Sequence, residues 1–183
     1  MKALELRCRL SRKHEVHGRC FTVLTKLLLV GLVAAGCAGP QGPAVGEIVR
    51  SGLCIQEVGG RYSQPQSTAG YATTGPLTLT DRTTEVPLRQ GVAFGYAWKA
   101  SNLPNPAVIT YRVEHPAITR PDGVSMSRFE EELEVETVGG KFQSTDCYAL
   151  SEKFELVPGT WTLSVLFRGS LLAKQSFHVH ASE

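Results

Sequence analysis

The chain has 183 residues, of which 42% are hydrophobic, and it carries 19 Lys and Arg against 17 Asp and Glu. This length suits one domain with a sizeable apolar core. The charge is unevenly spread, because residues 37–183 hold 12 basic and 15 acidic side chains, a net charge of −3. This balance offers no basic stripe for phosphates and therefore argues against nucleic acid as a partner.

A targeting segment opens the chain. Lys26 precedes an uncharged apolar run, residues 27–35, and Cys37 follows directly after Gly36. Nine apolar residues are too few to span a bilayer, which takes about 20, but they fit the apolar region of a signal peptide. The order of cation, short apolar run, small residues and cysteine resembles the signal peptide of a bacterial lipoprotein, with Ala34 where such signals more often carry Leu. We expect residues 1–36 to be removed and Cys37 to be lipidated.

The lipoprotein interpretation also predicts a location. Residues 37–46 then form the lipidated cysteine and a flexible Gly/Pro tether, followed by a β-sandwich domain over residues 47–181. Ala38 follows the cysteine, and by resemblance to enterobacterial sorting a residue other than Asp favours the outer membrane. We therefore expect the protein at the periplasmic face of the outer membrane, held through the lipid at Cys37. A plainly cleaved signal and an uncleaved form are the alternatives.

Two further cysteines follow Cys37. Cys54 and Cys147 form an even pair in an oxidising compartment, which predicts one disulfide. Closing a loop of about 93 residues would stabilise the fold by roughly 2–4 kcal/mol. The alternative is two buried thiols that never meet. Two cysteines alone do not make a zinc site, which needs four ligands.

Short apolar or β-branched stretches between turn residues predict strands. The clearest alternates Phe94, Tyr96 and Trp98 with small or polar residues. Residues 62–74 are polar and predict a long loop or a sheet edge, whereas residues 116–123 predict a turn. The predicted strands are residues 47–58, 77–86, 92–99, 107–115, 127–138, 141–150, 153–157, 160–167 and 171–180.

The last two predicted strands form an amphipathic hairpin joined at residues 168–170. On each strand, alternate apolar side chains share one face. These side chains are Trp161, Leu163, Val165 and Phe167 on the first strand, and Leu171, Ala173, Phe177 and Val179 on the second. No stretch shows a sustained helical period. The pattern predicts an all-β fold, an antiparallel β-sandwich.

Several of these segments resemble a family of bacterial domains. The segments are residues 48–52, the Pro-Gly-x-Trp turn that ends at Trp161, the turn at Gly169, and the closing strand at residues 175–179. They resemble domain of unknown function 3859, over roughly residues 45–180. The resemblance implies an immunoglobulin-like sandwich in a secreted protein or lipoprotein, and it supplies no catalytic residue.

An acidic strand is the first candidate site. Glu130, Glu132, Glu134 and Glu136 alternate along the chain and would share one strand face. Such a face could bind a divalent cation or a basic partner. Side chains on one strand face are about 7 Å apart, too far for one ion without other ligands. We favour a solvated face that protects a sheet edge.

The remaining candidates are aromatic and histidine side chains. Tyr62 and Tyr71 lie in the polar segment, which we expect to be a contact surface because loops on sandwiches often carry function. His178 and His180 could chelate a metal, but an exposed strand edge explains them more simply, and His115 suits a strand end. A third set could line a carbohydrate or apolar groove, although core packing is favoured: Phe94, Tyr96, Trp98, Tyr111 and Trp161.

No catalytic arrangement stands out. The sequence lacks a Gly-x-Ser-x-Gly elbow, and a disulfide explains Cys147 better than a thiol site with His115 does. The predicted function is a non-enzymatic envelope binding or accessory module with a protein partner and no cofactor. One alternative is a protease inhibitor that presents residues 101–107, stiffened by Pro104 and Pro106. The other is a metal-binding protein or enzyme that uses the acidic strand or His178 and His180.

Overall fold

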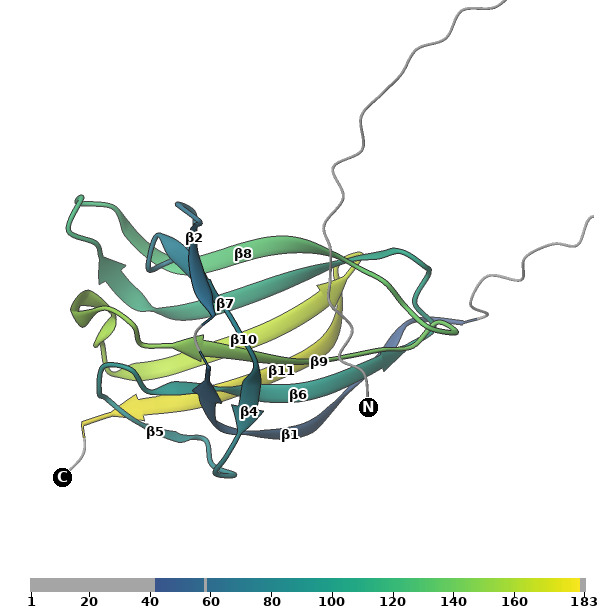
Figure 1. Ribbon diagram of the computed structural model, residues 1–183, viewed down its shortest axis with the longest axis horizontal. Helices are drawn as coiled ribbons and strands as arrows, with labels where there is room; N and C mark the ends of the chain where they lie inside the picture. The colour runs from purple at the N-terminus through teal and green to yellow at the C-terminus, as the bar shows by residue number, and fades with distance from the viewer. Residues whose placement is uncertain (1–41, 58, 182–183) are drawn as a thin grey trace, which may run out of the picture. The chain divides into compact units, whose positions relative to one another are not determined.

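The computed structural model describes residues 42–57 and 59–181, so the predicted signal peptide, Cys37 and the first part of the tether lie outside the described residues. Two sheets pack face to face and a small hairpin stands beside them (Figure 1). Apart from one parallel pair, the strands are antiparallel, which confirms the all-β, antiparallel prediction. No helix in this part of the chain is long and apolar enough to cross a membrane.

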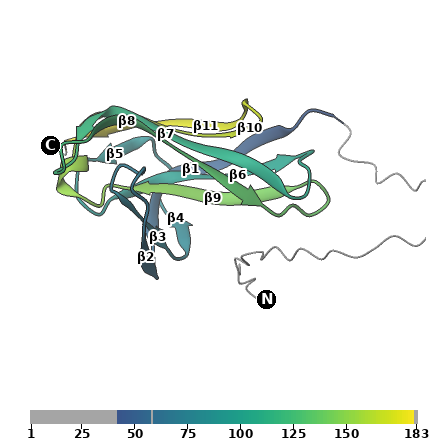
Figure 2. The same cartoon turned by 90° about the horizontal axis from the view of Figure 1, so that it is seen from above.

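The first sheet has four strands. Its order is β4 (Leu77–Leu79), β1 (Val45–Gln56), β6 (Ala93–Ser101) and β9 (Phe142–Ala149). β1 begins at Val45, so the last two residues assigned to the tether already pair with β6. The hairpin of β2 (Gly60–Ser63) and β3 (Tyr71–Thr74) projects with β4 from the outer side of this sheet (Figure 2).

The second sheet has five strands. Its order is β5 (Glu85–Pro87), β11 (Ser170–His180), β10 (Gly159–Phe167), β7 (Ala107–Thr119) and β8 (Ser125–Val135). β5 and β11 form the one parallel pair. β8 is the long edge strand, as the acidic pattern predicted, and β9 is the neighbouring edge of the other sheet.

The core lies between the two sheets. Phe94, Tyr96 and Trp98 are buried on the inner face of β6, and Trp161 and Phe177 come from the facing sheet. The ring of Phe94 lies 6.0 Å from that of Trp161 and 5.0 Å from that of Phe177. These aromatic side chains therefore pack the core, as expected, and do not line a ligand groove.

One predicted strand, residues 77–86, is wrong as a single element. Its halves are β4 and β5, which belong to different sheets. The Thr80 amide donates to the Leu53 carbonyl and the Leu53 amide donates to the Asp81 carbonyl, after which the chain leaves β1. A polar run then carries it across to the second sheet, where burial of Val86 starts β5.

Two further predictions were wrong between the strands. The turn expected at residues 116–123 begins later, because β7 continues through Pro116 to Thr119 with a bulge between Glu114 and Ile118. His115 thus lies within a strand and not at its end. Residues 153–157 hold a 3₁₀ helix, η1 (Lys153–Glu155), because Glu155 folds back to accept a hydrogen bond from the Glu152 amide.

Part of the polar segment and part of the last hairpin also differ from expectation. Of the two forms expected for residues 62–74, a long loop is wrong, because both ends pair as β2 and β3, the edge strands of a two-stranded sheet. On β10 the four predicted inward side chains are buried. On β11 the bulge beside Leu166 inserts Leu172, so Leu172 is buried and Leu171 is exposed. A single extra residue reverses the face of every side chain before it.

Candidate functional site

A polar cavity of about 190 Å³ lies between the β2–β3 hairpin and the sandwich. The loop joining β2 to β3 and the strand β3 form one wall, and residues of β1, β4, β7, β8, β9 and η1 contribute to the others. Among the lining residues, the larger polar side chains are Gln64, Thr68, Tyr71, Tyr111, Glu131, Tyr148 and Glu155. Enclosed titratable groups in a cavity indicate a candidate site, so the contacts of each decide what the site can do.

His115 fastens the hairpin loop to the sandwich beside this cavity. Its Nδ1 donates to the Pro116 carbonyl at 2.8 Å, so Nε2 is the acceptor for the Thr68 hydroxyl at 3.1 Å. The ring stacks on Trp161 with 4.8 Å between centroids. Burial lowers the pKa of His115, which keeps the ring neutral. Nε2 therefore holds the loop, and the bond of Nδ1 to the neighbouring residue of β7 fixes the orientation of the ring.

Glu155 is fully buried, and its carboxylate is held from two sides. It accepts hydrogen bonds from the Tyr148 hydroxyl and from the Glu152 amide. Burial raises the pKa of Glu155 and also that of the Tyr148 phenol. The Tyr71 hydroxyl donates to the Glu152 carboxylate at 2.8 Å. The acids on this side of the cavity thus connect η1 to β9 and to the hairpin.

Two polar atoms at the cavity lack such partners. Gln64 Nε2 and Tyr111 Oη are buried and have no hydrogen-bond partner among the described residues. Both side chains line the cavity, and the acidic Glu131 lines it as well. The cavity could hold a few water molecules, each of about 30 Å³, that accept from Gln64 and Tyr111. The cavity therefore suits water or a small polar molecule.

The structure brings Tyr62 and Tyr71 onto one hairpin, on adjacent strands. Tyr71 is half-buried, and the guanidinium carbon of Arg61 lies 4.4 Å from its ring centroid. Tyr62 is exposed, and its pKa is raised by partial burial and by the nearby negative charge of Glu131. Tyr62 is therefore the aromatic side chain that this hairpin presents to solvent.

The acidic residues do not gather around one point. Glu130 is held by Arg112 and Arg128, which lower the pKa of its carboxyl. Glu132 and Glu134 follow along the exposed side of β8, and Glu136 lies beyond the strand. Within residues 42–57 and 59–181 no group of three or more Asp, Glu, His or Cys could hold a metal ion. Glu131, which points the other way, is the acid of β8 that lines the cavity.

Other predicted sites also serve the fold. Cys54 and Cys147 are joined as a disulfide, the pair that the cysteine count predicted. The strand edge expected at His178 and His180 was wrong, because β5 pairs with this end of β11. The two rings stack with 5.8 Å between centroids, and His180 Nε2 lies 3.5 Å from a Glu85 carboxylate oxygen. In the loop 102–106, Leu103 is buried in the core, so this loop offers no large apolar side chain to a protease.

Sequence reasoning singled out Tyr71 and Tyr111 but missed most of the other polar residues at or beside the cavity. Glu152 and Glu155 had a local signal, because their spacing of three is that of a capping box. Gln64 and Thr68 had no such signal. Thr68 meets His115 from 47 positions away, a contact that only the tertiary fold creates.

Comparisons with known proteins agree on the fold. A family model described as domain of unknown function 3859 matches residues 46–179. An immunoglobulin-like protein from Pseudomonas aeruginosa is 25% identical, with a TM-score of 0.52 over 76% of this chain and 94% of that one. No curated protein matches.

A second solved structure is much less similar. It is an alkylpurine DNA glycosylase from Pseudomonas fluorescens bound to abasic-site DNA, 14% identical with a TM-score of 0.36. The match covers 50% of this chain and 27% of that one. A likeness this low supports no inference about binding or activity.

Proposed function

The chain belongs to the family described as domain of unknown function 3859, and from this premise we propose that it is a lipid-anchored bacterial envelope protein whose sandwich binds another protein without catalysing a reaction. The anchor is Cys37, at the periplasmic face of the outer membrane. The apolar run at residues 27–35 and the small residues before Cys37 support this address.

Three side chains of titratable types are already occupied by hydrogen bonds or a disulfide, which supports a non-catalytic role. His115 is bonded at both nitrogens, Glu155 accepts from two donors, and Cys147 is in a disulfide. In an active site, a nucleophile and a base lie within hydrogen-bond reach of each other and of open space. These three side chains instead fasten neighbouring elements together.

The projecting β2–β3 hairpin is the observation that carries the binding role. It stands off the outer face of the four-stranded sheet (Figure 2), and hydrogen bonds fasten its connecting loop (Thr68–His115) and the start of β3 (Tyr71–Glu152) to the sandwich. An exposed tyrosine, Tyr62, lies on this rigidly held hairpin. Tyrosine is enriched at protein interfaces, where it adds a large contact area at low entropic cost.

Site-specific photo-crosslinking in intact cells tests this role. We expect a photoreactive amino acid at position 62 to give a discrete adduct with one envelope protein. The matched control carries the same group at Lys174, which is exposed on the outer face of the other sheet. A third variant at Glu132 asks whether the β8 edge joins the interface. Equal adducts from positions 62 and 174, or none from position 62, would overturn the proposal.

A further inference from the structure

One end of the sandwich is set apart by where the chain enters it. β1 begins there at Val45, and the loops 102–106 and 136–141 and the turn 168–169 surround it. We call this the entry end. The β2–β3 hairpin follows the other end of β1, so it lies at the opposite end of the sandwich (Figure 1).

Exposed apolar side chains are concentrated at the entry end. Nine large hydrophobic residues are exposed in the described part of the chain, and five of them lie in its loops or within three residues of its strand ends. These are Val45, Val108, Leu133, Val138 and Leu171. Val138 is 84% exposed, Leu171 56% and Val45 55%. Val138 flanks a tight turn with Gly139 and Gly140 at its tip, and two hydrogen bonds with Lys141 close this turn.

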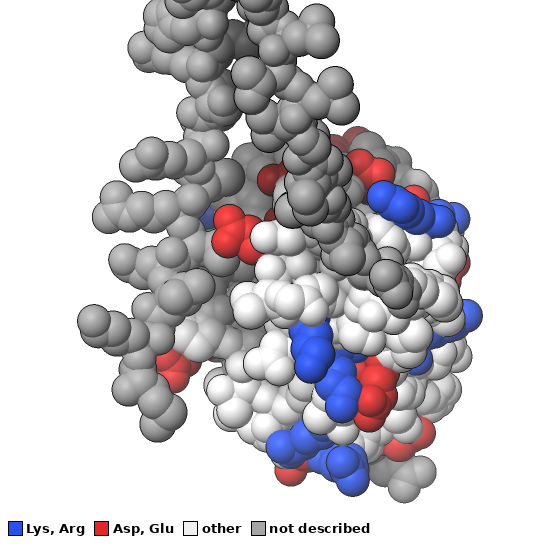
Figure 3. Space-filling view, turned by 90° about the vertical axis from the view of Figure 1, so that its right-hand side faces the viewer, with Lys and Arg blue, Asp and Glu red and all other residues white. Residues whose placement is uncertain are grey.

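Cationic side chains accompany these apolar ones. Lys141 and Arg168 lie at the entry end and make no ion pair with any residue that the structure describes. Two acids lie near them. Glu47 is paired with Lys99 at 3.1 Å, and Glu136 lies in the loop 136–141. Figure 3 views this end and shows several Lys and Arg side chains, some with Asp or Glu beside them, on an otherwise uncharged visible surface.

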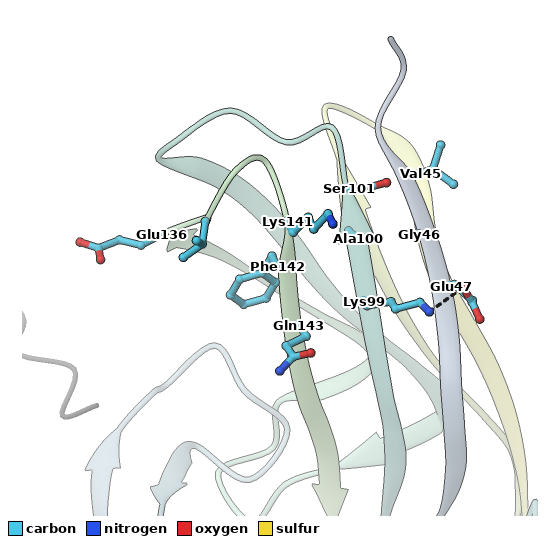
Figure 4. A pocket seen from close by; sticks show the side chains of 11 residues that line it. Val45, Gly46, Glu47, Lys99, Ala100, Ser101, Glu136, Lys141, Phe142 and Gln143 are labelled. Carbon is cyan, nitrogen blue, oxygen red and sulfur yellow. Dashed lines mark ion pairs between the residues drawn. The ribbon is translucent and has the colours of Figure 1, made fainter. Parts of the chain in front are cut away.

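A groove of about 730 Å³ opens at the same end, over β1, β6 and β9 (Figure 4). Val45 and Phe142 contribute apolar surface to its lining, and the acids Glu47 and Glu136 line it as well. Lys99 extends to its ion-pair partner Glu47 on β1, and Lys141 extends toward β6. Apolar surface bordered by cations is the chemistry with which peripheral proteins contact anionic lipid.

The position of Cys37 in the sequence also favours lipid as the ligand of the entry end. Cys37 is eight residues before Val45 in the sequence, a span of at most about 30 Å when extended. If Cys37 carries the lipid, as the proposed function holds, the entry end is the part of the sandwich nearest the headgroups. Anionic phospholipid would then meet Lys141 and Arg168, while Val138 would reach the boundary between headgroups and acyl chains.

We propose that the entry end of the sandwich is a membrane-contact surface, which binds anionic phospholipid through Lys141 and Arg168 with Val138 as an apolar contact. The contact holds the sandwich against the bilayer. It directs the β2–β3 hairpin away from the membrane, toward the partner.

Vesicle co-sedimentation tests the surface separately from the anchor. The chain starting at position 37 with Cys37→Ser contains both sheets, the core and the disulfide but no lipid. We expect it to bind vesicles of phosphatidylethanolamine with phosphatidylglycerol, more weakly at high salt, and to bind phosphatidylcholine vesicles poorly. The Val138→Asp, Lys141→Glu pair should weaken binding roughly tenfold, since each cation near an anionic surface contributes severalfold.

The matched control makes the same two changes at the opposite end, Val124→Asp with Lys153→Glu, both exposed positions. It should bind like the parent, and circular dichroism should show that both variants are folded. Equal loss in the two variants, or no binding by the parent, would overturn the proposal. Vesicle binding together with an unlipidated Cys37 would refute the anchor alone, whereas a lipidated Cys37 without vesicle binding would refute this surface alone.

Discussion

Asp146 illustrates how single polar side chains shape the interior. It lies on the inner face of β9, opposite Tyr96, and accepts hydrogen bonds from the Trp98 indole and from the Ser144 hydroxyl at 2.8 Å. Burial raises the pKa of its carboxyl, and the two hydrogen bonds oppose that rise only in part. The folded state therefore holds the proton more tightly than the unfolded state does.

This raised pKa has a definite sign for stability. The contribution of Asp146 is greatest below its unfolded pKa and is lost as the pH rises through its folded pKa. Asp146→Asn should remove that loss, since its oxygen can accept from Trp98 and its amide can donate to Ser144. Urea unfolding at several pH values should show a flatter profile for the variant and a higher stability at neutral pH.

Asp146→Ala provides the contrast. It leaves the Trp98 N–H without an acceptor and should destabilise the fold by about 1–3 kcal/mol. If the stability of Asp146→Asn depended on pH as strongly as that of the parent, burial of the Asp146 carboxylate would not be the cause of the pH dependence.

At the residue scale, alternation predicted the inward face of β6, because Phe94, Tyr96 and Trp98 are apolar or aromatic and bury large areas. Alternation did not predict which polar residues would be buried or half-buried. Half-buried Asp146 is hydrogen-bonded to Trp98, and buried Thr68 is hydrogen-bonded to His115, each partner nearly 50 positions away in the sequence. Their partners exist only once the sheets have formed.

Among the elements, the disulfide joins two strands that are not neighbours. Cys54 on β1 and Cys147 on β9 lie on the outer face, and β6 runs between them. Gly95 of β6 is paired with Cys147, and a Cβ there would approach the Asp146 carbonyl oxygen to 2.0 Å. Glycine at this position lets the strands lie close beneath the bridge.

Replacing both cysteines by alanine should lower the free energy of unfolding by about 2–4 kcal/mol, because the bridge closes a loop with a sequence separation of 93. Denaturant titration measures the difference. The reduced parent is the control, and its midpoint should match that of the double variant. An oxidised parent no more stable than the variant would contradict the expected role of the bridge.

Elements with strong alternation, such as β6 and β10, could be predicted from sequence, whereas others could not. The split between β4 and β5 depends on a backbone pairing with β1, and threonine-rich sequence suits either arrangement. The exposure of Leu171 depends on a bulge that the amino-acid pattern does not reveal. Glu155 needed the tertiary fold to make a buried helical turn in place of a strand.

Taken as a whole, the sandwich has two chemically different ends. The entry end combines exposed apolar side chains with Lys141 and Arg168, and the other end carries the fastened hairpin with Tyr62. A lipid at Cys37 would explain this division, since it would place one end at the membrane and leave the other free for a partner. Lipidation of Cys37 is thus the condition on which this division of roles depends.

Intact mass of the protein purified from its native membrane, before and after reduction, is the most direct test. We predict the mass of residues 37–183 plus the added acyl groups, two hydrogen atoms lighter before reduction because of the Cys54–Cys147 bridge. A mass that retains Cys8 and Cys20 and carries no acyl group would contradict the lipid anchor and the envelope location together.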